Sequence, residues 1–85
     1  MEDYLVSILQ ACNNRDWKEA PEENFDETEV FKVEGDEQCL YYWNCANSEE
    51  VRHSEALTQI ANELLSGEES GEVFDGWNNI MFEVK

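Results

Sequence analysis

The stretch EVFKVEGDEQCLYYWNC, residues 29–45, carries the clearest strand signals in the chain. Its first part, residues 29–34, alternates its side chains with the period of two that is typical of a strand. Its last part, residues 38–45, is rich in aromatic residues, which favour strands. Gly35 lies in the short connection between the two parts. We therefore predict an antiparallel hairpin with a short, glycine-containing turn.

The hairpin contains two adjacent tyrosines, Tyr41 and Tyr42. Successive strand residues point to opposite faces, so both rings can be buried only if both faces of the sheet are covered. We expect one of the two to be exposed beside carboxylates. An exposed aromatic side chain among acidic residues is typical of an anchor in a protein interface.

Two segments have helical periodicity. Residues 3–13 repeat apolar side chains at helical spacing, after acidic residues at the end where the helix dipole favours them. Residues 48–66 form the clearest helix, which Asn47 or Ser48 can cap at its start and Gly67 at its end. Its expected buried stripe consists of Leu57, Ile60, Ala61, Leu64 and Leu65.

The remaining segments complete the predicted order. Residues 15–28 lack periodicity and indicate a surface connection, and residues 67–76 indicate an acidic loop punctuated by glycine. Trp77–Val84 alternates as a final strand. We therefore predict a single α+β domain over residues 1–85, in the order α-β-β-α-β. A mostly antiparallel, three-stranded sheet would carry the helices packed on it.

The composition is that of a folded, strongly acidic domain. The 85 residues include 21 Asp and Glu against five Lys and Arg, a formal net charge of −16. This is about twice the upper end of the usual magnitude for a small domain, about 2–8. Hydrophobic residues make up 41% of the chain and aromatic residues 12%, which is too much apolar surface for a disordered acidic tail. Nucleic acid and anionic membranes are disfavoured as direct partners, and a basic protein surface is favoured.

The size of the domain suits a nucleic-acid groove. A compact chain of this length has a radius of gyration of roughly 12 Å and spans on the order of 30 Å. Duplex DNA carries roughly 18 charges over that length, the same order as this protein. Two other interpretations of the charge are solvation of the surface and adaptation to high salt. The second is disfavoured because Glu is much commoner here than Asp and three cysteines are present.

The acidic residues fall into three clusters. Acids two apart on a strand lie about 6.6 Å from one another, a spacing similar to that of successive phosphates. Carboxylates crowded in this way raise the local potential unless a cationic surface meets them. We therefore predict that the clusters bind a partner. Their residues are Glu19, Glu22, Glu23, Asp26, Glu27 and Glu29, then Glu34, Asp36 and Glu37, and last Glu68, Glu69, Glu72 and Asp75.

No pattern of catalytic or metal-ligating residues emerges. The acidic turns do not match the calcium-binding loop of an EF-hand. A zinc site of Cys39, Cys45 and His53 would lack a fourth ligand and a close cysteine pair, so His53 is interpreted as a packing or surface residue. A domain this small offers little cavity for a substrate. We expect no cofactor, no metal and no enzymatic activity.

The three cysteines are an odd set without close pairing, so we expect them to be reduced. The first residues lack the basic region of a signal peptide, and no apolar run reaches the length of a membrane span. The expected location is the cytoplasm, of the host cell if a phage encodes the protein.

In size, acidity and α+β pattern, the chain resembles small phage and mobile-element inhibitors that mimic nucleic acid. Anti-CRISPR proteins, uracil-glycosylase inhibitors and anti-restriction proteins are examples. The resemblance covers the whole chain in composition and rests on no signature motif. It implies a stoichiometric inhibitor that blocks the basic DNA- or RNA-binding groove of a nuclease or RNA-guided effector complex, with an anti-CRISPR protein first. An aromatic such as Trp17, Tyr42 or Phe74 would slow its release.

Two alternatives stay open. The first is an immunity protein against a basic nuclease toxin, which predicts the same electrostatics. The second is a non-inhibitory, acidic adaptor subunit, which predicts an apolar contact patch around Trp43 and Trp77, with the acids only solvating the surface.

Overall fold

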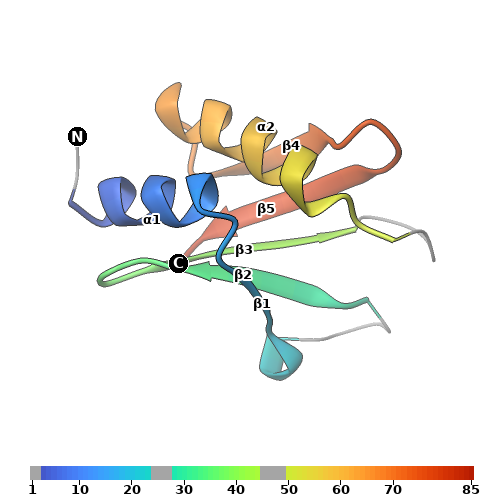
Figure 1. Cartoon of the computed structure of the whole chain (residues 1–85), viewed down its shortest axis with the longest axis horizontal. Coiled ribbons are helices and arrows are strands. Elements are labelled where there is room, and N and C mark those ends of the chain that lie inside the picture. Colours follow the sequence, from blue (N-terminus) through green and yellow to red (C-terminus); the bar gives the residue numbers. More distant parts are fainter. Residues whose placement is uncertain (1–2, 24–27, 45–49) are drawn as a thin grey trace.

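Two helices pack on one face of a five-stranded antiparallel sheet (Figure 1). The computed structural model describes residues 3–23, 28–44 and 50–85. The elements follow the order α-β-β-β-α-β-β, with one short 3₁₀ helix, η1, after the first strand. They are α1 (Asp3–Asn13), β1 (Trp17–Glu19), η1 (Pro21–Glu23), β2 (Val30–Glu34), β3 (Cys39–Asn44), α2 (His53–Leu65), β4 (Ser70–Phe74) and β5 (Asn79–Val84).

The predicted hairpin forms the centre of the sheet. Strands β2 and β3 pair antiparallel, with Phe31 opposite Tyr42 and Lys32 opposite Tyr41. Across the sheet the strand order is β1-β2-β3-β5-β4, and every neighbouring pair is antiparallel. The final strand begins at Asn79 rather than Trp77, because residues before it form the turn from β4.

The predicted three-stranded sheet is wrong, because it lacks the two edge strands. Strand β1 has three residues, all exposed, so no burial pattern marks it in the sequence. Strand β4 buries only Val73 and contains Gly71, against which the ring of Phe82 packs. Both strands take their structure from hydrogen bonds to a neighbouring strand, which local side-chain patterns do not reveal.

Both ends of α1 and the C-terminal end of α2 agree with the predictions. Helix α1 has the predicted bounds, and Gly67, with φ of 98°, follows the end of α2 as a left-handed cap. Helix α2 begins at His53, with Arg52 before it and no capping side chain. The predicted start and its caps, Asn47 and Ser48, lie outside the described residues. No helix in the described ranges is long and apolar enough to cross a bilayer.

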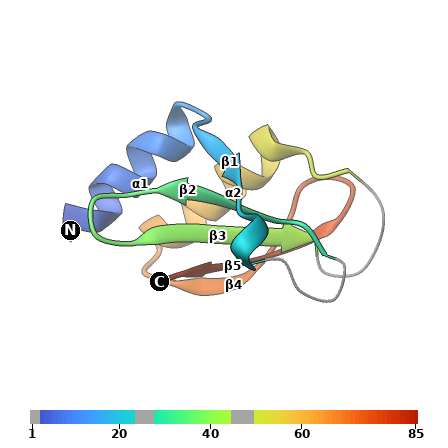
Figure 2. The ribbon, with the colours of Figure 1, turned by 90° about the horizontal axis from the view of Figure 1, so that it is seen from below.

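The core lies between α1 and α2 and one face of the sheet, and the other face carries neither of these helices, only η1 beside it (Figure 2). Tyr42 is on the covered face and fully buried, whereas Tyr41 is on the open face and half-buried, as the alternation requires. The most deeply buried apolar side chains are Ile8, Cys12, Val33, Leu40, Leu57, Ile60, Ile80 and Phe82.

Candidate protein-binding surface

Parts of the two later acidic clusters, distant in sequence, lie at the same end of the sheet, whereas Asp75 lies at the opposite end, in the β4–β5 turn. Strands β2 and β5 end there and β3 and β4 begin there, so the β2–β3 turn and the α2–β4 turn lie at the same end of the sheet (left in Figure 1). We call Asp36, Glu37, Glu68 and Glu69 the acidic end; all four are exposed. Three strand spacings of about 4.8 Å separate β2 from β4, so the acidic end spans about 14 Å.

Backbone contacts hold both turns of the acidic end in place. The N–H of Asp36 donates to Ser7 Oγ of α1 at 2.8 Å, and Gly35 N–H donates to the carbonyl of Gln38 at 2.9 Å. In the other turn, the N–H of Glu68 donates to the Glu63 carbonyl at 3.1 Å. The carboxylates are therefore presented by fixed backbone, which lowers the entropy that a partner must remove on binding.

The first cluster divides between an edge of the sheet and the 3₁₀ helix. Glu19 lies on the edge strand β1, and Glu29 precedes β2; both are exposed. Glu22 and Glu23 lie in η1, beside the open face. Asp26 and Glu27 lie outside the described residues. The structure therefore does not gather this cluster into one group with the acidic end.

Lysines on the open face neutralise several of the predicted acids. Lys18 and Lys32 are cross-strand neighbours on β1 and β2. Lys18 binds Glu34, and Lys32 Nζ lies 3.3 Å from Glu22 Oε1 and 3.9 Å from Glu34. A hydrogen bond to its own backbone and one from Lys32 lower the pKa of Glu22, and the bond from Lys18 lowers the pKa of Glu34. These two acids thus already have cationic partners within the chain.

A third lysine occupies a hollow on the same face. Lys85 Nζ lies 3.2 Å from Glu23 Oε2, 4.0 Å from Glu83 Oε1 and 5.1 Å from the centroid of the Tyr41 ring. Glu83 is directly opposite Tyr41 in the register of β3 and β5. The hollow has a volume of about 260 Å³. Its lining residues are Glu23, Val30, Tyr41, Trp43, Glu83 and Lys85.

The backbone of Lys85 pairs with Cys39 at this end of the sheet, but its ammonium group lies beside Glu23 and the Tyr41 ring. None of the ion pairs among the described residues involves Asp36, Glu37 or Glu68. Both arginines are held elsewhere: Arg52 stacks over the Trp77 ring, and Arg15 binds hydroxyl and carbonyl oxygens near α2. The acidic end is therefore a region of concentrated negative charge beside a face whose charge is largely balanced.

The remaining predicted acids differ in accessibility. Glu72 is exposed on the edge strand β4, on the same side of the sheet as Tyr41. Asp75 is 1% exposed and accepts backbone N–H groups from Arg52, Trp77 and Asn78 at 2.9, 2.8 and 2.6 Å. Its carboxylate holds the β4–β5 turn together and is covered by the fold.

Of the three aromatic side chains predicted as possible anchors, Trp17, Tyr42 and Phe74, only two are exposed. Tyr42 is fully buried, so it cannot anchor a partner. Trp17 is 38% exposed, and its ring stacks on His53. Phe74, the last residue of β4, is 58% exposed, and Trp77, in the turn that follows, is 57% exposed. The sequence did not show which of Tyr41 and Tyr42 would be exposed beside carboxylates; in the structure it is Tyr41, which is half-buried.

The titratable groups under the helices serve packing. Burial raises the pKa of Cys12 to about 11, against the effect of Arg15, so its thiol is protonated at neutral pH. His53 accepts or donates a hydrogen bond with the Tyr42 hydroxyl at 2.7 Å and lies between aromatic rings. No three His, Cys, Asp or Glu side chains among the described residues are grouped to hold a metal ion.

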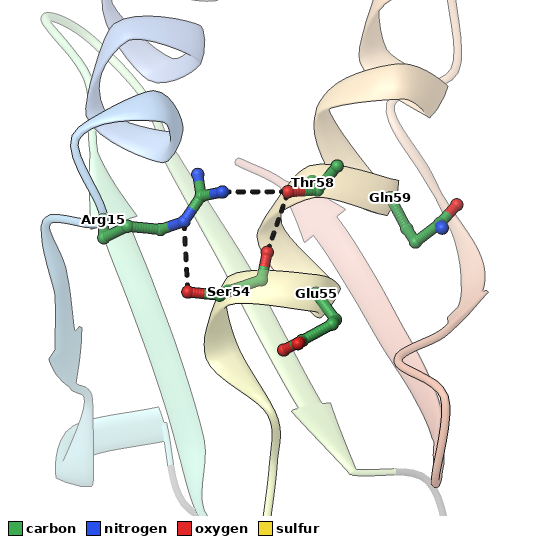
Figure 3. Close-up of a pocket in the computed structure, with 5 residues that line it drawn as sticks. All are labelled: Arg15, Ser54, Glu55, Thr58 and Gln59. Carbon is green, nitrogen blue, oxygen red and sulfur yellow. Dashed lines mark hydrogen bonds between the residues drawn. The ribbon is translucent and has the colours of Figure 1, made fainter.

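A shallow pocket lies where α1 ends against the start of α2 (Figure 3). The backbone of Arg15 is in the left-handed region, with φ of 60°. Its side chain lines the pocket and donates to Ser54 Oγ at 3.3 Å and to Thr58 Oγ1 at 2.9 Å. Thr58 in turn donates to the Ser54 carbonyl at 2.9 Å. These bonds tie the loop after α1 to α2 and use the guanidinium of Arg15 for structure.

The described surface combines an acidic end on fixed turns with an open sheet face that carries a half-buried aromatic hollow. The sequence identified the acidic residues but did not show which of them form ion pairs with lysines, because those ion pairs depend on strand register. Glu83 was missed, although its alternation with Phe82 already placed it on the open face. Comparison with protein-family models, curated proteins and solved structures finds no match.

Proposed function

We propose that this protein is a stoichiometric inhibitor that binds the cationic nucleic-acid-binding groove of another protein through its acidic end. The groove would belong to a nuclease or an RNA-guided effector complex, as in anti-CRISPR proteins. The observation that carries the proposal is that Asp36 and Glu37, and Glu68 and Glu69, lie exposed at the same end of the sheet. No ion pair among the described residues involves the first three of these carboxylates.

The distribution of the lysines supports a directed role for the charge. A surface acidic only for solvation has no reason to segregate its bases. Here all three lysines form ion pairs on or beside the open face, with Glu22, Glu23, Glu34 and Glu83. The lysine ion pairs among the described residues do not include Asp36, Glu37 or Glu68, and the negative potential around these three carboxylates favours a cationic partner.

The dimensions also suit a groove that holds nucleic acid. The domain measures 35 × 26 × 20 Å, with a radius of gyration of 11.7 Å. Its longest axis corresponds to about 20 phosphate charges of duplex DNA, the same order as the net charge of −16. The acidic end would enter the groove, and its carboxylates would bind the lysine and arginine side chains that bind phosphates.

The experiment measures displacement of fluorescent DNA from cationic partners. The protein is titrated into RNA-guided effector complexes and basic nucleases, each holding a labelled cognate nucleic acid. The proposal predicts displacement by at least one of them, complete at one protein per partner. Failure against the whole panel at low salt would contradict the proposal.

Two variants of equal charge separate a directed surface from general acidity. The first, Asp36→Asn with Glu37→Gln and Glu68→Gln, removes three charges from the acidic end. The control, Asp16→Asn with Glu50→Gln and Glu55→Gln, removes three exposed charges from elsewhere. The first is expected to weaken displacement at least tenfold more than the control. Equal effects would indicate that only the net charge matters.

The immunity-protein alternative predicts the same behaviour toward a single toxin, so the genes beside this one separate the two. A nuclease toxin gene upstream favours immunity, and phage structural or regulator genes favour a defence inhibitor. An adaptor subunit instead predicts binding that survives neutralisation of the acidic end.

A further inference from the structure

We propose that the hollow beside Tyr41 is a binding site for an arginine side chain of a protein partner, and that Lys85 fills its cation position in the free protein. The inference deepens the proposed function, on which its partner class rests, by adding a second contact on the open face. The acidic end supplies charge, and the hollow supplies a shaped anchor.

The groups around the hollow are those that recognise an organic cation. Lys85 Nζ lies within 5.1 Å of the Tyr41 ring centroid, inside the range at which an aromatic face attracts a cation. Glu23 and Glu83 supply carboxylate oxygens at 3.2 and 4.0 Å from the same nitrogen. The lysine thus marks, within the chain itself, where a positive group is stable.

The shape of the hollow also points to a ligand larger than one ammonium group. About 260 Å³ of space remains beside Lys85. Val30, 3% exposed, forms part of the lining together with the half-buried ring of Trp43. Apolar walls with a few placed polar groups are typical of a binding pocket, and they suit the methylene stem of a long basic side chain.

The internal contacts of Lys85 are exchangeable. The side chains of Lys85, Glu23 and Glu83 are 51%, 32% and 49% exposed. Ion pairs this exposed contribute little to stability, since water screens them and the side chains lose freedom. An incoming cation can therefore replace Lys85 at low cost, while Lys85 remains free to move into solvent.

Arginine fits the site better than a second lysine. Its planar guanidinium can stack on Tyr41 while it donates to two carboxylates, which a point charge cannot do. The neighbouring Lys32, opposite Tyr41 on β2, is already bound to Glu22, so its repulsion of the ligand is partly offset. A protein surface that binds phosphates is rich in such arginines.

The test uses a blocked pentapeptide with one central arginine, and two matched peptides with lysine or neutral citrulline in its place. Binding to the whole chain is followed by NMR shifts of the β3 amides and the Trp43 indole. The expected order of affinity is arginine, then lysine, then citrulline. Lys85→Met is expected to raise the arginine affinity about fivefold, the upper range for release of an exposed ion pair.

Two tyrosine variants provide the structural control. Tyr41→Phe keeps the ring and is expected to keep the affinity, whereas Tyr41→Leu should lower it about two- to fivefold. The double variant Glu23→Gln, Glu83→Gln should also lower the affinity for the arginine peptide. If Lys85 serves the fold alone, Lys85→Met lowers the melting temperature and leaves arginine and citrulline indistinguishable, which would overturn the inference.

The peptide measurement is independent of any macromolecular partner. Arginine binding without displacement of DNA would support the hollow and contradict the proposed function. Displacement of DNA with no arginine preference would leave the proposed function standing and reject the hollow as an anchor.

Discussion

The hydroxyl oxygen of Tyr42 lies 2.7 Å from Nδ1 of His53 beneath the ring of Trp17, which stacks on the imidazole at 3.7 Å. Burial lowers the pKa of His53 from its ordinary value of 6.5, although Glu50 and Asp75 oppose the shift. The folded protein therefore favours the neutral ring, and protonation favours the unfolded chain.

The first prediction concerns this histidine and pH. Between pH 6.5 and the lower pKa of the folded state, the unfolded chain binds a proton that the folded one does not, so stability falls as pH falls. The difference in unfolding free energy between the wild type and His53→Gln should shrink from pH 7.5 to pH 5. Urea unfolding at both values measures it, and a constant difference would contradict the assignment.

The second prediction concerns Asp75, whose burial opposes ionisation. Backbone N–H groups of Asn78, Arg52 and Trp77 outweigh that effect and lower its pKa. In Asp75→Asn, one oxygen can still accept from residues 77 and 78, but the new amide group faces the N–H of Arg52. We expect a loss of about 1–3 kcal/mol, the cost of an unsatisfied buried donor. Asp16→Asn, an exposed control, should change urea stability little.

The third prediction concerns the turn that carries Asp36. A Cβ at Gly35 would lie 2.6 Å from Ile8 Cγ1 and 2.7 Å from the carbonyl oxygen of Gln38. Because one of these atoms belongs to the backbone, the turn must shift. Gly35→Ala should destabilise the fold by about 1–3 kcal/mol, as overpacking does. Asp36→Ala in the same turn serves as the control; similar melting temperatures for both would refute the close contact.

The fourth prediction concerns salt and the fold. A net charge of −16 on a domain of this size opposes the compact state by self-repulsion. Added salt screens that repulsion and should raise the melting temperature, with each 1 kcal/mol appearing as about 4–8 °C. Calorimetry in low and high sodium chloride measures the change. A fall with salt would mean that the lysine pairs outweigh the repulsion.

The sequence predicted the elements whose side chains face the core. Alternation in β2, β3 and β5 follows directly from burial on one side, so their core faces were correct. The predicted stripe of α2 was correct at Leu57, Ile60 and Leu64 but wrong at Leu65, which is 60% exposed at the end of the helix. The edge strands were not predicted, because β1 buries no side chain and β4 buries only Val73. Helix α2 begins at His53, and residues 50–52, which the prediction included in the helix, are not helical.

The candidate surface was only partly predictable. Acidic residues are visible in any sequence, but which of them meet a lysine depends on strand register, as with Lys18 and Glu34 across β1 and β2. Asp75 resembled the other acids until the turn placed it under three backbone donors. That residues 36 and 68 lie at the same end of the sheet could not be predicted without β4, which the predicted sheet lacked.

The salt dependence of DNA displacement tests the central claim most directly. The affinity of this protein for the partner from which it displaces DNA is measured at several salt concentrations. The wild type is compared with the triple variant Asp36→Asn, Glu37→Gln and Glu68→Gln. We predict a steep loss with salt for the wild type and a clearly shallower slope for the triple variant, because fewer ion contacts remain to be screened. Identical slopes would mean that the acidic end does not touch the partner, and would contradict the account.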